Sequence, residues 1–240
     1  MANPSQHEST DASISPPPPK DLKDRLKASY DAIAPRYNEW TAHTNSNSRL
    51  VYLEELLPHL TSSNAPVSVL ELGCGAGIPC TQKLASYSNI SITANDLSST
   101  QIALAKENLS KTGGKHVSFV ESDMMALDLP FQAFDAIIAL YSIIHLPRDE
   151  QVLLISRIAK WLKPGGFLLA NFGADGLPGC EEQHWLEEDK GWMFWSSWGV
   201  GRTVELIKEA GLEIKLQVVE SDEGDATFLW VVAKRPEVRI

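Results

Sequence analysis

The sequence has little of several features that mark large protein classes. Its three cysteines, Cys74, Cys80 and Cys180, are odd in number and lack metal-ligand spacing, so we expect neither disulfides nor a bound metal. Apolar runs such as Ala136–Leu140 are far shorter than the roughly 20 residues of a membrane helix. No basic patch followed by an apolar stretch marks a secretory signal at the N-terminus. The sequence therefore predicts a cytoplasmic protein that does not associate with membranes.

Positive charge is also scarce. Lys and Arg number 21 against 31 Asp and Glu, which gives a formal net charge of −10 at pH 7. Such a chain repels a phosphate backbone unless a basic face is segregated, and no basic cluster is visible, so we expect no nucleic-acid partner. The hydrophobic content of 43% is ordinary for a globular protein, and 240 residues suffice for one α/β domain.

The domain organisation follows from proline and from apolar spacing. A disordered tail is predicted over residues 1–20, because the prolines of Pro16–Pro19 prevent a helix. One domain is predicted over residues 21–240, opening with a helical cap over residues 21–62 in which apolar residues recur every three or four positions. The first cap helix is expected to end around Pro35, and the second covers Leu50–Leu60.

From Pro66 onward, short β-branched runs alternate with helical segments, which is typical of a doubly wound parallel α/β sheet. Two final strands are expected to pair as a hairpin around Glu223 and Gly224. The predicted strands are Val67–Leu72, Ile90–Asn95, Val117–Glu121, Phe134–Leu140, Phe167–Phe172, Glu213–Glu220 and Ala226–Lys234. The predicted helices of this part are Gly77–Ser86, Ser98–Lys111, Glu150–Leu162 and Gly201–Ala210.

A glycine-rich loop after the first of these strands is the most informative local pattern. It reads Glu71-Leu72-Gly73-Cys74-Gly75-Ala76-Gly77, and alternate glycines let a backbone turn tightly and approach a ligand closely. Asp96 follows Gly77 by 19 residues, at the end of the next predicted strand, where a carboxylate can accept both hydroxyls of a ribose. The two features together predict a site for a nucleoside-containing cofactor.

Two cofactor classes satisfy this pairing, and the loop discriminates between them. The dinucleotide fingerprint G-x-G-x-x-G brings a helix N-terminus to a pyrophosphate, whereas here the third glycine comes one position early and Glu71 precedes the loop. A carboxylate disfavours a pyrophosphate but stabilises a sulfonium or an ammonium group. The residues therefore favour S-adenosylmethionine, and an NAD-dependent oxidoreductase is the less favoured reading.

At this point the sequence resembles the class I S-adenosylmethionine-dependent methyltransferases. Residues 71–77 resemble motif I of that family, and Asn95-Asp96-Leu97 resembles its ribose-binding motif. Tyr30–Tyr37 resembles the small-molecule branch, methyltransferase type 11, typified by ubiquinone-biosynthesis enzymes. The resemblance implies a Rossmann-like, seven-stranded sheet, mostly parallel with an antiparallel last strand, and N-terminal capping helices. It also implies S-adenosylmethionine as cofactor and S-adenosylhomocysteine as product.

The resemblance also assigns cofactor contacts. Glu71 would orient the loop and the ammonium group, Asp96 would hold the ribose, and Asp123 would accept from the adenine amine. Met124 is equally consistent with filling the core, and Tyr37 with helix packing. The implied cofactor contacts are Tyr37, Glu71, Gly73, Cys74, Gly75, Gly77, Asp96, Leu97, Asp123, Met124 and Leu140.

The methyl acceptor is expected after the fourth strand, where Tyr141 and Ser142 would contact it. His145 is the candidate general base, because an imidazole with a pKa near 6.5 can take a proton around neutrality. A purely structural role for this histidine stays open. The Asn-Pro-Pro-aromatic run of amide-methylating branches is absent from this place, which argues against an amide acceptor.

Residues 173–199 contain five large aromatic side chains without a regular period, and we interpret them as a lid insertion. In this hypothesis Trp192 and Trp195 line an apolar acceptor pocket. The alternative is a satellite hydrophobic cluster that closes an irregular insertion.

The sequence therefore predicts an enzyme that moves a methyl group from S-adenosylmethionine to an O, N or S nucleophile of a small organic acceptor, with carbon as the less favoured acceptor atom. Neither the acceptor nor the oligomeric state follows from the residues. The alternative is a protein that keeps the cofactor fold and binds the cofactor without methyl transfer, as a partner subunit or for another reaction.

Overall fold

A computed structural model describes residues 17–44, 46–111, 116–222 and 226–237. The predicted tail falls mainly on residues 1–16 and the predicted turn on Glu223 and Gly224, which lie outside these ranges. Residues 17–20 precede the first helix without forming a helix or a strand. Within the described ranges, no helix is both long enough and apolar enough to cross a membrane.

A seven-stranded sheet forms the centre of the fold, as predicted, with the strand order β3-β2-β1-β4-β5-β9-β8. β9 runs antiparallel to both of its neighbours, whereas the strands from β3 to β5 are parallel. The central strands β1 and β4 are almost completely buried, which explains their continuous apolar sequence. The strands are β1 Val67–Leu72, β2 Ile90–Asp96, β3 Val117–Glu121, β4 Phe134–Ala139, β5 Leu162–Gly173, β8 Glu213–Ser221 and β9 Thr227–Lys234.

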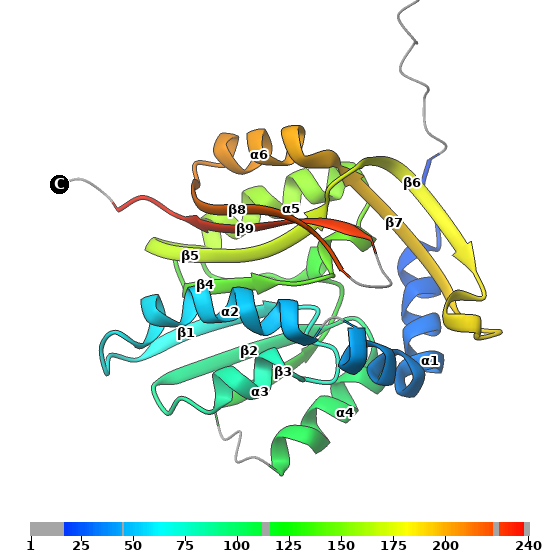
Figure 1. The fold of residues 1–240 in the computed structure, drawn as a ribbon. Coiled ribbons are helices and arrows are strands. Elements are labelled where there is room, and N and C mark those ends of the chain that lie inside the picture. The colour runs from blue at the N-terminus through cyan, green and yellow to red at the C-terminus, as the bar shows by residue number, and fades with distance from the viewer. Residues whose placement is uncertain (1–16, 45, 112–115, 223–225, 238–240) are drawn as a thin grey trace, which may run out of the picture.

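Helices cover both faces of the sheet and enclose two hydrophobic cores (Figure 1). On one face lie α2 (Ser46–Thr61), α3 (Cys80–Ala85) and α4 (Ser99–Ser110), and on the other lie α5 (Arg148–Trp161) and α6 (Gly199–Glu209). Three short 3-10 helices, η1 (Met124–Ala126), η2 (Ile143–His145) and η3 (Trp185–Glu187), follow strands β3, β4 and β6. The helix expected from Gly77 begins later, at Cys80, so the glycine loop is longer than predicted.

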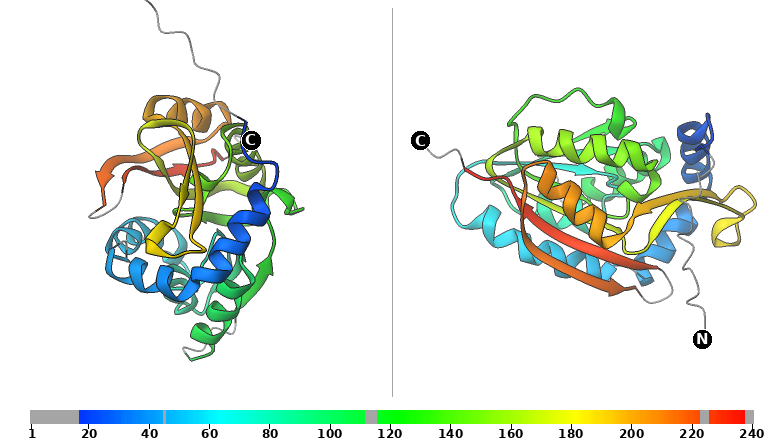
Figure 2. Two further views of the ribbon diagram at one scale, coloured as in Figure 1. Left: turned by 90° about the vertical axis from the view of Figure 1, so that its right-hand side faces the viewer. Right: turned by 90° about the horizontal axis from the view of Figure 1, so that it is seen from above.

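Two elements lie outside this sandwich, at the end where the parallel strands terminate. The long helix α1 (Leu22–Thr44) and the hairpin of β6 (Gly176–Gln183) and β7 (Trp192–Trp198) stand side by side there (Figures 1 and 2). The prediction that the first helix ends around Pro35 is wrong, because the missing proline N–H costs one helical hydrogen bond while the packing of Tyr37 and Trp40 beyond it is retained. The Trp-rich stretch, read as irregular, is this β-hairpin.

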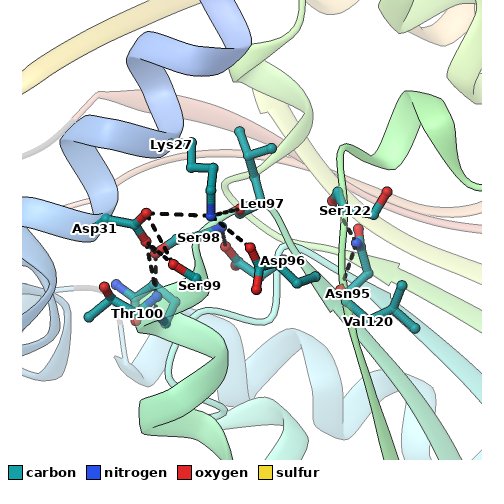
Figure 3. A network of polar contacts seen from close by, with 12 residues as sticks. Lys27, Asp31, Asn95, Asp96, Leu97, Ser98, Ser99, Thr100, Val120 and Ser122 are labelled. Atoms are coloured by element: carbon teal, nitrogen blue, oxygen red, sulfur yellow. Dashed lines mark hydrogen bonds and ion pairs between the residues drawn. The ribbon is translucent and has the colours of Figure 1, made fainter.

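Polar contacts fix α1 onto the sheet end, and Figure 3 shows them. Asp31 accepts hydrogen bonds from the Ser98 hydroxyl at 2.6 Å and the Thr100 amide at 2.9 Å, at the N-terminus of α4. Lys27 donates to the Leu97 carbonyl and to Glu121. Burial alone would raise the pKa of Asp31, but these hydrogen bonds and the Lys27 charge lower it. Asp31 therefore caps one helix while it anchors another.

We predict that Asp31→Ala lowers the free energy of unfolding by about 1–2 kcal/mol, because the Thr100 amide and the Ser98 hydroxyl at the start of α4 lose their acceptor. Urea denaturation followed by circular dichroism measures the change. Glu39→Ala, which removes an exposed carboxylate from the same helix, is the matched control and should change the free energy by about 0.5 kcal/mol or less. Equal effects of the two substitutions would contradict the anchoring role.

Candidate active site

A cleft with about 980 Å³ of empty space opens where β1, β2 and β4 end and α1 crosses above them. The connection after β1 leads to α3 on one face, and the connection after β4 leads to α5 on the other, so the backbone separates there. Gly77 faces α4 instead of the cleft. Of the predicted cofactor contacts, those that line the cleft are Tyr37, Glu71, Gly73, Cys74, Gly75, Asp96, Leu97, Asp123, Met124 and Leu140.

The glycine loop requires residues without a side chain, for different reasons at different positions. Gly73 and Gly75 have φ angles of 78° and 54°, in the left-handed region that side chains disfavour. A Cβ on Gly73 would lie 2.5 Å from the Cβ of Ser142. A Cβ on Gly75 would meet nothing within 4 Å, because this residue borders the open cleft. Gly73 is thus needed for the fold, and Gly75 keeps the cleft open.

Two carboxylates lie at the strand ends beside this loop, and Asp96 holds it. Asp96 accepts from the amide of Gly75 and from the amide of Ser98, each at 2.8 Å, and burial raises its pKa. Glu71, at the end of β1, is buried and accepts from the Thr81 hydroxyl at 2.6 Å. Burial raises the pKa of Glu71 to about 7, although Thr81 and the charge of Arg49 oppose this shift. The cleft therefore offers negative charge to a cationic group.

Arg49 is a cleft residue that the sequence analysis missed. It lies on α2, is only 8% exposed, and holds its guanidinium 4.4 Å from the ring centre of Tyr141. The amide of Gln101 also borders the cleft, and neither of its polar atoms has a hydrogen-bond partner among the described residues. No motif marks either residue, since each is a single polar position on a helix. Both are suited to meet the polar groups of a ligand.

A second cavity, with about 1020 Å³ of empty space, lies between α1, η2 and the β6–β7 hairpin. Its walls are mainly aromatic. The Trp185 ring packs within about 6.3 Å, between ring centres, of Tyr30, Tyr37, Trp40 and Trp195. The hairpin lies beside α1 (Figure 2). Trp185 comes from the tip of the hairpin, and its ring contacts with α1 close this cavity.

The cavity does not contain both predicted tryptophans. Trp195 lines it, as expected for a pocket residue. Trp192 instead packs on α1, where its amide donates to the Ser29 hydroxyl at 2.8 Å and its ring lies 3.8 Å from the Arg25 guanidinium. Trp192 therefore attaches the hairpin to α1 and lies outside the lining of either cavity.

The side chains that line both cavities are Tyr30, Tyr37, Tyr141 and His145. We call this group the junction. Ser142, the other predicted acceptor contact, lines only the cofactor-side cleft and donates to the Leu72 carbonyl at 2.8 Å. The junction is where a ligand in one cavity meets a ligand in the other.

His145 has a partner on each ring nitrogen. Nδ1 lies 2.9 Å from the Phe194 carbonyl oxygen, which can only accept, so Nδ1 carries the proton. Nε2 consequently accepts from the Tyr30 hydroxyl at 2.9 Å. Burial lowers the pKa of His145 to about 4. A neutral ring with these contacts is better suited to orient Tyr30 than to take a proton at neutral pH.

The described residues contain no group of three or more His, Cys, Asp or Glu side chains arranged to hold a metal ion.

Comparison with known proteins agrees with this geometry. A family model described as a methyltransferase domain matches residues 69–166, which extend from β1 into the first half of β5. Residues 69–166 therefore form a methyltransferase domain. The part of the chain that this family model covers contains the carboxyl ends of β1, β2 and β4, which border the cleft.

Several sterol 24-C-methyltransferases are similar in sequence to this chain. That of Gibberella zeae is 26% identical over 187 residues, which cover 74% of this chain and 48% of the relative. That of Debaryomyces hansenii is 34% identical over 114 residues, covering 47% of this chain and 29% of the relative. The matches thus span less than half the length of either relative.

Solved structures share the fold across nearly the whole chain. A 1,6-didemethyltoxoflavin N1-methyltransferase of Burkholderia thailandensis, crystallised with 1,6-didemethyltoxoflavin and S-adenosylhomocysteine, gives a TM-score of 0.68 at 20% identity and covers 98% of this chain and 100% of that one. The cyclase SpnF gives a TM-score of 0.70 at 20% identity, covering 90% and 97%. At these identities the likeness concerns the fold.

The two loop glycines give a matched pair of substitutions. We predict that Gly73→Ala lowers the free energy of unfolding by about 2 kcal/mol or more, because its Cβ meets Ser142 at a left-handed φ. Gly75→Ala should lower it by about 1 kcal/mol, from the left-handed φ alone, but should weaken binding of S-adenosylhomocysteine more strongly. Thermal unfolding and calorimetric titration measure the two effects, and the opposite order would contradict the assigned roles.

Proposed function

We propose that this protein transfers a methyl group from S-adenosylmethionine to an oxygen, nitrogen or sulfur atom of a small organic molecule. The observation that carries the proposal is the pair of cavities. One contains the family's glycine loop, the other has aromatic walls, and they share a junction of four side chains. Such an arrangement can hold a cofactor and an acceptor with their reacting atoms in contact.

The residues of the cleft fit the cofactor group by group. Asp96 is placed for the ribose hydroxyls, and Asp123, with Leu97 and Met124 beside it, for adenine. Glu71 is suited to the ammonium and Arg49 to the carboxylate of the methionine portion, because each brings the opposite charge. The unpartnered amide of Gln101 is a further polar contact for the ligand. When bound, S-adenosylmethionine supplies an electrophilic methyl group.

The protein's part in the reaction is mainly positioning. Transfer needs the nucleophile about 3 Å from the methyl group and in line with the departing sulfur. Tyr30, Tyr37 and Tyr141 border the place where the two ligands meet, and the aromatic walls exclude water. We infer that the hairpin over residues 173–199 is the lid of the acceptor cavity, with Trp185 as its closing residue.

The acceptor is proposed to be a small and largely apolar molecule, since aromatic rings form most of the second cavity. A cytoplasmic location is proposed as well, in keeping with the three free thiols of Cys74, Cys80 and Cys180. The second candidate function is cofactor binding without methyl transfer. This second candidate is supported by the similarity in fold to SpnF, which is a cyclase.

We predict that the affinity for S-adenosylmethionine rises with pH between about 5.5 and 7.5. The pKa of Glu71 is raised to about 7, so its carboxyl is largely neutral at the lower pH and gains the charge that attracts an ammonium as pH rises. The dissociation constant should fall roughly tenfold over this range in calorimetric titrations. Glu71→Gln should bind more weakly and lose this pH dependence, and a pH dependence that is unchanged in the variant would contradict the role of Glu71.

We predict that Asp96→Ala weakens cofactor binding by about 1–3 kcal/mol through loss of charge-assisted hydrogen bonds. Calorimetry measures this, and incubation of the wild-type protein with methyl-labelled cofactor and a broad acceptor panel measures transfer. A labelled product supports the enzyme. Tight cofactor binding without a labelled product favours the second candidate, and unchanged affinity in the variant removes Asp96 from the ribose site.

A further inference from the structure

The junction shows a directional pattern of hydrogen bonds, and it extends the proposed methyl transfer, on which the inference rests, to the class of acceptor. Tyr30, Tyr37 and Tyr141 each bring one phenolic proton to the place where the cavities meet. A phenol that gives its proton to a group behind it can only accept from a group in front of it. The partners of these hydroxyls therefore decide what the junction recognises.

Tyr141 gives its proton to Asp222. The hydroxyl lies 2.5 Å from Oδ2 of Asp222, which is 6% exposed and also accepts from the Ser48 hydroxyl at 3.0 Å. Both carboxylate oxygens thus receive protons from hydroxyl groups. The Tyr141 backbone is equally fixed, since its amide donates to Asn171 at 2.6 Å and its φ of 55° is left-handed. The oxygen of Tyr141 consequently acts as an acceptor toward the cavities.

Tyr30 follows the same pattern by a different route. The Phe194 carbonyl holds the proton of His145 on Nδ1, which leaves Nε2 to accept the Tyr30 proton. Burial first, and the charges of neighbouring groups second, raise the pKa of Tyr30, so the phenol keeps its proton. The phenolic protons of Tyr30 and Tyr141 therefore both have partners within the protein.

The second cavity also has an electrostatic preference, for neutral acceptors over anionic ones. Among the lining residues that the structure describes, none is Lys or Arg, and the one carboxylate is that of Glu182. The imidazole of His145 is neutral. An anionic acceptor would give up its hydration without finding a positive partner there. The cavity therefore disfavours carboxylates and thiolates.

We propose that the junction selects an acceptor whose nucleophile carries hydrogen, namely a neutral hydroxyl or amino group on a flat, apolar molecule. The hydroxyl or amino group of the acceptor donates its hydrogen to the phenolic oxygens. This hydrogen bond orients the lone pair of the acceptor's nucleophilic atom toward the cofactor cleft. Asp222 is a positioning residue, because it directs the Tyr141 proton away from the cavities.

The test is a comparison of three probes of one shape. The protein is saturated with S-adenosylhomocysteine at pH 7.5, and 2-naphthol, 2-methoxynaphthalene and 2-naphthoate are titrated by calorimetry. Naphthol should bind about tenfold more tightly than its methyl ether, which lacks the donor, and the naphthoate anion should bind most weakly.

Variants separate recognition from folding. Tyr141→Phe removes an accepting oxygen, so the preference for naphthol over the methyl ether should fall severalfold. Asp222→Leu frees the Tyr141 proton to point into the cavity, which should also reduce the preference and improve binding of naphthoate. Glu220→Leu is the matched control, because this carboxylate on β8 accepts from Tyr52, which lines neither cavity, and it should leave the preference unchanged.

Three results would overturn the proposal: binding of naphthoate at least as tight as that of naphthol, an unchanged preference in Tyr141→Phe, or no binding of naphthol at millimolar concentration. These results are distinct from failure of the proposed function. A protein that does not bind S-adenosylhomocysteine fails at the first step, whereas one that binds it but shows no donor preference refutes only the acceptor class.

Discussion

The structure depends on the separation of the backbone between β1 and β4. These strands are neighbours and parallel, yet the chain leaves one toward α3 and the other toward α5. This divergence opens a crevice at the carboxyl ends of the strands. The loop beside it turns through left-handed glycines. Gly75 is held by Asp96, and Gly73 leaves no room for a side chain beside Ser142. The cofactor cleft is thus a consequence of strand order and of one short loop.

The acceptor side depends on elements added outside the sheet. The Asp31 contacts fix α1 above the strand ends, and Trp192 attaches the hairpin to α1. The hairpin then places Trp185 against the aromatic side chains of α1 and closes a second cavity. His145, bonded to Tyr30 on one side and to the Phe194 carbonyl on the other, links sheet, helix and hairpin at the junction. The contacts of His145 therefore determine both the packing of the junction and the direction of its hydrogen bonds.

Much of the sheet and most of the cleft lining could be predicted from the sequence. Buried parallel strands read as apolar β-branched runs, and the glycine loop has a fixed spacing to Asp96. Features that depend on tertiary contacts could not be predicted. Pro35 resembles a helix end because the packing that carries the helix past it is not local. Arg49 and Asp222 are single charged residues without a motif, and they meet Tyr141 only in the folded chain.

The most direct measurement of the central claim is a crystal structure of the protein grown with S-adenosylhomocysteine. The account predicts the ribose at Asp96, adenine beside Asp123, the methionine carboxylate at Arg49 and the sulfur facing the junction. Density for the nucleoside elsewhere on the protein, or a pyrophosphate compound bound over the glycine loop in its place, would contradict it.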